Sequence, residues 1–120
     1  MTKAELVRYC LSKKGVREDY PFGPEPLVLK VGSKMFALVA DDPGRLVVSL
    51  KCEPELAYLL RQQYEAVKPG YHLNKRHWNS VEVDGTIPED ELFGMIDVSY
   101  ALVARKLTRA EKERLGLTAV

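Results

Sequence analysis

The sequence has two cysteines, two histidines, one tryptophan and no long apolar run. Cys10 and Cys52 lie 42 positions apart among apolar neighbours and form no CxxC pair, so we predict two buried free thiols and no disulfide framework. No segment approaches the roughly 20 apolar residues that cross a bilayer, and the first residues lead into an amphipathic pattern that differs from a signal peptide. We therefore expect a cytoplasmic protein without a membrane-spanning segment.

The sequence also lacks an excess of either sign of charge, because the formal net charge is +1. This balance excludes a compact, strongly cationic domain, the class of protein whose overall charge indicates nucleic-acid binding. The distribution is uneven, however, since residues 45–77 carry six cations and three acids whereas residues 78–97 carry six acids and no cation. A bipolar surface and the ordinary charge variation of a solvated surface both remain open as interpretations.

With 120 residues, 46% of them hydrophobic, the chain fits a single domain over residues 1–120 with a sizeable core. Thr2 and Glu5 form a capping box that predicts a first helix, which Gly15 is expected to end. Pro54 predicts a second helix that stops before residue 68. Three leucines are expected to form its buried stripe: Leu56, Leu59 and Leu60.

Pro88 predicts the longest helix, and Thr108 with Glu111 predicts a last one that runs to about residue 115. Near-helical spacing assigns the buried stripe of the longest helix to Leu92, Ile96, Ser99, Val103 and Leu107.

Branched and aromatic residues predict strands over 27–31 and 35–40, joined by a hairpin turn at Gly32 and Ser33. A turn over residues 41–44 leads to a strand over 46–51, and a short strand covers 81–83. The segment 19–26 contains three prolines, so we expect an extended loop. The order α-β-β-β-α-β-α-α predicts an α+β fold, with a small, mainly antiparallel sheet packed on helices.

The segment 69–81 holds both histidines, the tryptophan, two asparagines and two adjacent cations. Such side chains can bind phosphates or stacked bases. They can also fix an irregular loop onto a core, so both roles are open for this segment. In the structural interpretation, Trp78 and Leu73 are core anchors, His72 is buried and hydrogen-bonded, and Asn74 caps a single helical turn.

Several strings of the chain resemble the MmcQ/YjbR family. They are Asp19-Tyr20-Pro21-Phe22-Gly23, the hairpin run 29–38, Val48-Ser49-Leu50-Lys51, Tyr71-His72-Leu73-Asn74-Lys75-Arg76-His77-Trp78, Asp84-Gly85 and Ser99-Tyr100. The resemblance covers nearly the whole chain and implies a compact frataxin-like, double-wing domain. Members are commonly labelled DNA-binding, which is an analogy at the level of the fold. The resemblance implies no catalytic residue set and no cofactor.

For nucleic-acid binding, six residues are the candidates. We expect Lys51, Lys75 and Arg76 to contact phosphates, and Tyr71, Asn74 and His77 to add polar or stacking contacts. The partner would be DNA or RNA, bound weakly and in a salt-dependent manner.

Three other functions are weighed against this one. A metal site fits poorly, because His72 and His77 are five positions apart, no carboxylate lies between them, and Lys75 and Arg76 would repel a metal cation. A hydrolase could use either histidine as a general base, but no complete catalytic set is visible, so we expect a non-enzymatic protein. A protein-interaction adaptor could use the loop from Tyr20 to Pro24, although we expect Tyr20 and Phe22 to fold back over the sheet. We expect a monomer.

Overall fold

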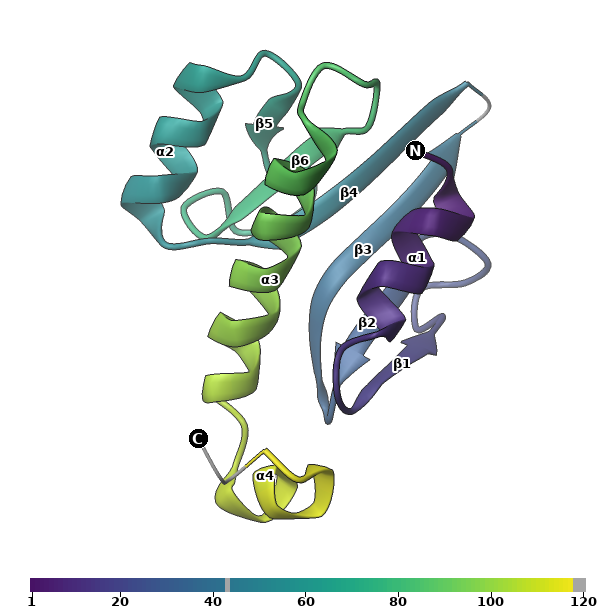
Figure 1. Ribbon diagram of the computed structural model, residues 1–120, viewed down its shortest axis with the longest axis vertical. Helices are drawn as coiled ribbons and strands as arrows, with labels where there is room; N and C mark the ends of the chain where they lie inside the picture. Colours follow the sequence, from purple (N-terminus) through teal and green to yellow (C-terminus); the bar gives the residue numbers. More distant parts are fainter. Residues whose placement is uncertain (43, 118–120) are drawn as a thin grey trace.

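The computed structural model describes residues 1–42 and 44–117 of the chain. The elements follow in the order α1 (Lys3–Leu11), β1 (Val16–Asp19), β2 (Leu27–Val31), β3 (Lys34–Asp42), β4 (Arg45–Lys51), α2 (Pro54–Gln63), β5 (Val67–Pro69), β6 (Trp78–Glu82), α3 (Glu89–Arg105) and α4 (Arg109–Leu115). Figure 1 shows α1, α2 and α3 in front of the strands and α4 at the lower end. None of the described helices is long and apolar enough to span a bilayer.

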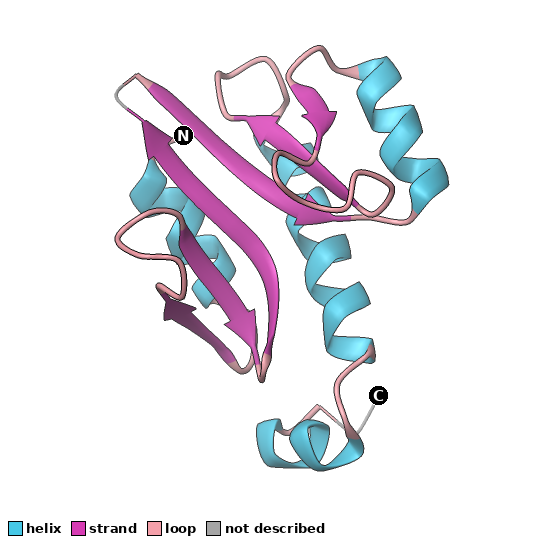
Figure 2. Ribbon diagram, turned by 180° about the vertical axis from the view of Figure 1, so that it is seen from behind, coloured by secondary structure: helices cyan, strands magenta, loops and turns pink. Residues whose placement is uncertain are grey.

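The six strands form one sheet in the order β1-β2-β3-β4-β6-β5, and every neighbouring pair is antiparallel. Figure 2, seen from behind, shows the sheet in front of α1 and α3, so the molecule has one layer of strands and one of helices. The α+β fold class and the antiparallel sheet are confirmed. Sequence patterns did not reveal β1 and β5, which are short and polar and lie at the two edges. Pro43 of the predicted turn lies outside the described residues.

Local signals placed the start of α1 and both ends of α4 well. The Thr2 hydroxyl accepts a hydrogen bond from the Glu5 N–H at 3.1 Å, and the Glu5 carboxylate accepts one from the Thr2 N–H at 3.1 Å. This is the predicted capping box. Gly15 has φ 77° and lies beyond the C-cap at Ser12, so it shapes the following turn and does not end the helix. The Thr108 hydroxyl likewise accepts from the Glu111 N–H at 3.1 Å, but the Glu111 carboxylate accepts from the Ser33 N–H at 2.8 Å, so only half of the second predicted capping box forms in the described part of the chain.

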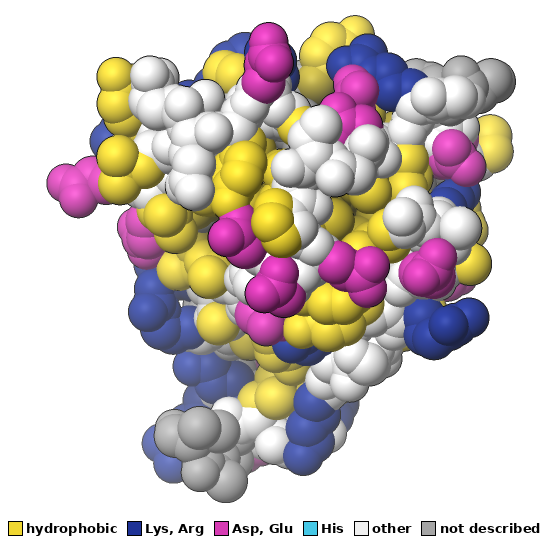
Figure 3. Space-filling model, turned by 45° about the horizontal axis from the view of Figure 1, so that its top comes forward, with side chains coloured by type: hydrophobic (Ala, Val, Ile, Leu, Met, Phe, Trp, Pro, Cys, Tyr) yellow, Lys and Arg dark blue, Asp and Glu magenta, His cyan; other side chains and the backbone are white. Residues whose placement is uncertain are grey.

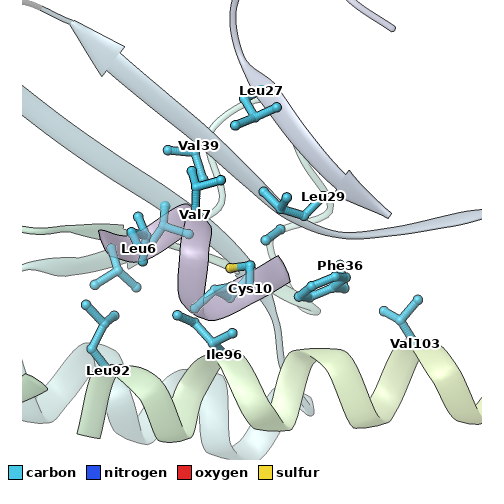
Figure 4. Close-up of a cluster of buried hydrophobic side chains, with 14 of the residues drawn as sticks. Leu6, Val7, Cys10, Leu27, Leu29, Phe36, Val39, Leu92, Ile96 and Val103 are labelled. Carbon is cyan, nitrogen blue, oxygen red and sulfur yellow. The ribbon is translucent and has the colours of Figure 1, made fainter. Parts of the chain in front are cut away.

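The core lies between the sheet and helices α1 and α3. Figure 4 shows side chains from both helices and from β2 and β3 pointing into one cluster. The predicted α3 stripe is confirmed, because Leu92, Ile96, Ser99 and Val103 are all buried and Leu107 is buried just beyond the helix. Cys10 lies in this cluster, and its burial raises the pKa of the thiol to about 12. Both cysteines are buried and free, as predicted.

A bulge in β3 fixes the position of Phe36. The pairing register between β2 and β3 shifts between Leu29 and Lys30, leaving Phe36 without a partner residue on β2. The Ser99 hydroxyl donates to the Phe36 carbonyl at 2.6 Å and accepts from the Lys51 N–H at 2.9 Å. Ser99 is fully buried, and it therefore pairs two backbone groups between the bulge and the end of β4.

The expected buried stripe of α2 is wrong. Leu56 and Leu59 are exposed, Leu60 is half-buried, and Ala57 is the buried residue of the helix. The reason is the position of α2 over β5 and β6 at the edge of the sheet, where a small residue allows close approach. There the Asn79 side-chain amide donates to the Ala57 carbonyl at 3.3 Å. The opposite side of α2 carries leucines that nothing in the described structure covers.

One ionic cluster joins α1 to α3. The Tyr9 hydroxyl donates to the Asp97 carboxylate at 2.6 Å, Lys13 forms an ion pair with the same carboxylate, and the Phe93 ring stacks on Tyr9 with centroids 3.9 Å apart. Burial raises the pKa of Asp97, but the hydrogen bonds from Lys13 and Tyr9 outweigh it, and the pKa lies below its ordinary value of 3.8.

We expect Asp97→Asn to lower the free energy of unfolding by about 1 kcal/mol at neutral pH. Because the pKa of Asp97 is depressed in the folded state, its stabilisation is present above the ordinary value and is lost as the pH falls through the lower, folded one. Urea unfolding of both proteins along a pH series checks this, and the difference between them should shrink in acid. A difference that stays constant down to the acid limit would contradict the assignment.

Candidate nucleic-acid interface

The irregular segment between β5 and β6 is held by its own backbone. The Gly70 N–H donates to the Trp78 carbonyl at 2.8 Å, and the Trp78 N–H donates to the Asn74 carbonyl at 2.9 Å. A Cβ atom on Gly70 would lie 2.7 Å from the Cβ of Trp78, so a glycine permits this close approach. The Asn74 carboxamide oxygen accepts from the Arg76 N–H at 3.0 Å, which is the predicted cap of the short turn.

Arg61, on α2, anchors this turn from the helix side. Its Nε donates to the Asn79 carboxamide oxygen at 2.6 Å, and Nη2 donates to the carbonyls of Trp78, at 3.3 Å, and of Lys75. The planar guanidinium suits such a set of acceptors, because its N–H groups point in fixed directions. Sequence reasoning missed Arg61. A lone arginine in the last turn of a helix has no pattern that distinguishes an anchor from a solvated side chain.

The three predicted phosphate contacts lie at the end of the interior strand β4 and in the turn before the interior strand β6. Lys51 ends β4 and is the register partner of Trp78, and the Cys52 N–H donates to the His77 carbonyl at 2.7 Å. Lys75 and Arg76 are exposed in the turn directly before Trp78, and Lys51 is half-buried. Over residues 1–42 and 44–117, the ion pairs include none of these three cations. The Lys75 ammonium donates to the Gly70 carbonyl at 2.9 Å.

The remaining candidates differ in accessibility. Tyr71 is 74% exposed, Asn74 is exposed and His77 is half-buried. Trp78 is buried, as predicted for a core anchor, and Leu73 is half-buried.

The predicted burial of His72 is wrong. His72 is exposed, and its ring lies against that of Tyr71, with centroids 4.0 Å apart. The physical reason lies in the backbone, because the turn requires a left-handed conformation at this position, with φ 59°. In the described part of the chain, neither histidine side chain takes part in a hydrogen bond.

A groove of about 1260 Å³ borders this turn. It lies on the sheet face opposite the helices, and Figure 2 shows loops in front of the sheet on that side. Strands β3, β4 and β6 contribute Leu38, Val47, Ser49 and Ser80, and the turn contributes Tyr71 to Leu73. The hydroxyls of Ser49 and Ser80 are 2.8 Å apart, and Ser80 accepts from the Tyr71 N–H at 3.0 Å. The turn is thereby fixed to the sheet.

Phe22 lines the same groove from the loop that precedes β2. The expectation that Tyr20 and Phe22 fold back over the sheet is wrong, since the side chains are 50% and 62% exposed. The prolines and Gly23 leave this loop without a regular ladder of hydrogen bonds.

The two signs of charge are unevenly distributed on the face that Figure 3 draws. Acidic side chains lie across its middle, most lysines and arginines lie toward its rim and lower end, and no histidine is in view. Glu89, Asp90 and Glu91 lie in the first turn of α3. The cation-rich segment is partly neutralised at the other end of β4, because Arg45 forms an ion pair with Glu82 at 2.8 Å. No group of three or more potential metal ligands gathers anywhere in the described residues.

The architecture and the irregular turn define a class of small α+β proteins with a six-stranded antiparallel sheet and four helices. The sequence profile of the YjbR family matches residues 11–102, and the chain belongs to that family. It is 38% identical to the protein YjbR of Escherichia coli strain K12 over 96% of this chain and 98% of that one. It is 40% identical to the protein YbdF of Escherichia coli O157:H7, over 90% of this chain and 88% of that one. The names of both relatives describe them as uncharacterized and assign no activity.

Solved structures agree with this assignment. The crystal structure of Deinococcus radiodurans protein DR2400 matches with a TM-score of 0.87 at 42% identity, over 97% of this chain and 88% of that one. A crystal structure of a Pseudomonas syringae protein matches with a TM-score of 0.77 at 28% identity, over 86% of this chain and 99% of that one. The arrangement of strands and helices described above is therefore shared with these proteins.

Proposed function

We propose that this protein binds nucleic acid without catalysing a reaction, through the region formed by the end of β4 and the turn before β6. The observation that carries the proposal is that Lys51 is the register partner of Trp78, which directly follows Lys75 and Arg76 in the chain, and that none of the three cations is in an ion pair among the described residues. Cations outside ion pairs are available to phosphates, although Lys75 also donates to the Gly70 carbonyl, and neutralising phosphates releases condensed counterions.

Exposed aromatic surface supports a single-stranded ligand. Tyr71 is 74% exposed beside the cations, and Phe22 lines the same groove. Aromatic rings stack on unpaired bases whatever the sequence, because every base has a flat face. Asn74 can make fewer contacts to a ligand than expected, because its side-chain oxygen already caps the turn. Its amide N–H groups remain as donors. Given the small net charge, we expect dissociation constants of roughly 1 to 100 micromolar at physiological salt.

The test is a fluorescence-anisotropy titration of a labelled single-stranded oligonucleotide at several salt concentrations. We expect the triple variant Lys51→Gln, Lys75→Gln, Arg76→Gln to bind more weakly and to show a smaller salt dependence. Each lost phosphate contact lowers the slope of log affinity against log salt by about 0.7, so the three together should lower it by about 2.

A matched control removes the same charge elsewhere. Lys34, Lys112 and Arg114 also lie outside every described ion pair, at the hairpin and on α4. Their triple replacement by Gln should retain a wild-type salt slope. Binding that ignores salt, or an equal loss in both triple variants, would contradict the proposed site.

A second candidate is a protein-interaction adaptor, and the observation that favours it is the exposure of Tyr20 and Phe22 in the loop before β2. Rings held beside prolines lose little entropy when a partner binds them. Affinity capture with and without nuclease distinguishes the two candidates. Partners retained after nuclease treatment and lost in Phe22→Ala would support the adaptor, whereas recovery that disappears with nuclease would support nucleic-acid binding.

A further inference from the structure

Helix α3 has an outward side that is almost free of charge. Between Glu91 and Arg105 the helix carries one charged residue, Asp97, and that carboxylate is held against Tyr9 and Lys13 on the flank that faces α1. A helix that faces water normally presents polar and charged residues on that side. The outward positions here are Gly94, Met95, Val98, Ala101 and Leu102, each exposed or half-buried.

The neighbouring helix enlarges this surface. Leu56 and Leu59 of α2 are exposed, and Val98 of α3 is 37% exposed. An apolar groove of about 360 Å³ runs between the two helices, with Leu56 and Leu60 on one side and Met95 and Val98 on the other. Contiguous apolar surface of this kind marks a contact site more often than scattered exposed residues do.

The pattern along α3 is symmetric about Val98. In an antiparallel pair of identical helices related by a two-fold axis at residue 98, Glu91 faces Arg105, Gly94 faces Leu102 and Met95 faces Ala101 of the other copy. Each small residue thus meets a large one, as interdigitating helix surfaces require. Opposite charges meet at both ends, and antiparallel helix dipoles also align favourably.

We infer that the α2–α3 face, defined by Leu56, Leu59, Gly94, Met95, Val98, Ala101 and Leu102, binds the same face of a second copy of this chain in an antiparallel, two-fold arrangement. Such a contact is self-complementary, as a two-fold dimer requires. Charge complementarity favours this occupant over an anionic lipid surface, because Glu89, Asp90 and Glu91 stand at one end of the face. The inference replaces the monomer expected from the sequence and does not depend on the proposed nucleic-acid site, although Lys51 of that site also lines the α2–α3 groove.

Sedimentation equilibrium over a range of protein concentrations tests the inference. We expect wild-type protein to approach twice the chain mass of 13.6 kDa at high concentration. Val98→Asp places two carboxylates at the axis and should weaken self-association at least tenfold. Because Val98 is exposed, the variant should keep its circular-dichroism spectrum and melting temperature.

Charge reversal tests the register. Glu91→Lys and Arg105→Glu should each weaken self-association, and the two changes combined should restore it. Arg105 also forms an exposed ion pair with Glu53 at 3.7 Å, so Lys106→Glu serves as its control and Glu89→Lys as the control for Glu91. Both controls should self-associate like wild type, since these residues lie off the stripe.

Each other result overturns the inference. A wild-type protein that stays monomeric at several hundred micromolar would show that this face does not bind a second copy. A dimer that tolerates Val98→Asp would place the contact elsewhere. A combined charge reversal that stays monomeric would exclude the antiparallel register.

Discussion

Replacing Phe36 by alanine is expected to lower the free energy of unfolding by about 3–5 kcal/mol. Phe36 is fully buried in the core, and its ring meets that of Tyr100 edge to face, with centroids 5.5 Å apart. Truncation removes the transfer free energy of the ring and leaves a cavity that a bulged strand closes poorly. The bulge is already tied by the Ser99 hydroxyl, so β3 has little freedom to shift inward.

Chemical denaturation followed by tryptophan fluorescence measures this effect, since Trp78 is the single reporter. Phe36→Leu retains most of the side-chain volume, so it should lower the free energy of unfolding by clearly less than Phe36→Ala does. Tyr71→Ala removes an equally large aromatic residue from a 74% exposed position and should leave stability nearly unchanged. A loss at Phe36 no larger than at Tyr71 would mean that the core does not depend on this ring.

Arg61→Met is expected to lower the free energy of unfolding by about 2 kcal/mol and to loosen the turn between β5 and β6. The change removes the donors to Asn79, Lys75 and Trp78. Asn79 is buried, so its oxygen would be left without that partner in a site closed to water. Amide hydrogen exchange should therefore accelerate over residues 71–78 and remain slow in α3.

Arg61→Lys separates charge from geometry. The lysine keeps the positive charge, but one ammonium cannot satisfy the three acceptors in the directions that the guanidinium reaches. We therefore expect faster exchange in the turn for the lysine variant as well, together with weaker nucleic-acid binding at unchanged net charge. Exchange and affinity like those of wild type in both variants would show that the turn holds its shape without Arg61.

Sequence patterns predicted the elements whose signals are local. The N-caps at Thr2 and Thr108 and the spacing of the α3 stripe depend on residues close together in the chain, so their physical causes can be read directly. Strands β1 and β5 depend on pairing with distant segments and have little apolar pattern of their own. The error on α2 has a related cause, because the buried side of a helix is set by what it packs against.

The candidate site likewise has features that the sequence predicted and features that it did not. A cation-rich turn with a capping asparagine is visible in the sequence, and the structure contains that turn. The exposure of His72 follows from a left-handed backbone that a histidine adopts without an obvious sequence signal. Arg61 acts across 14 positions of sequence to reach Lys75, and no local pattern reports such a contact.

The two edge strands bear on how the protein behaves when it is concentrated or partly unfolded. β1 has four residues, with Arg17, Glu18 and Asp19 among them, and β5 has three and ends in Pro69. A strand that is short, charged or closed by a residue lacking an N–H is a poor template for another chain. The rims of this sheet thus discourage strand-by-strand polymerisation into fibrils, even though β2, β3 and β4 between them are rich in valine and leucine.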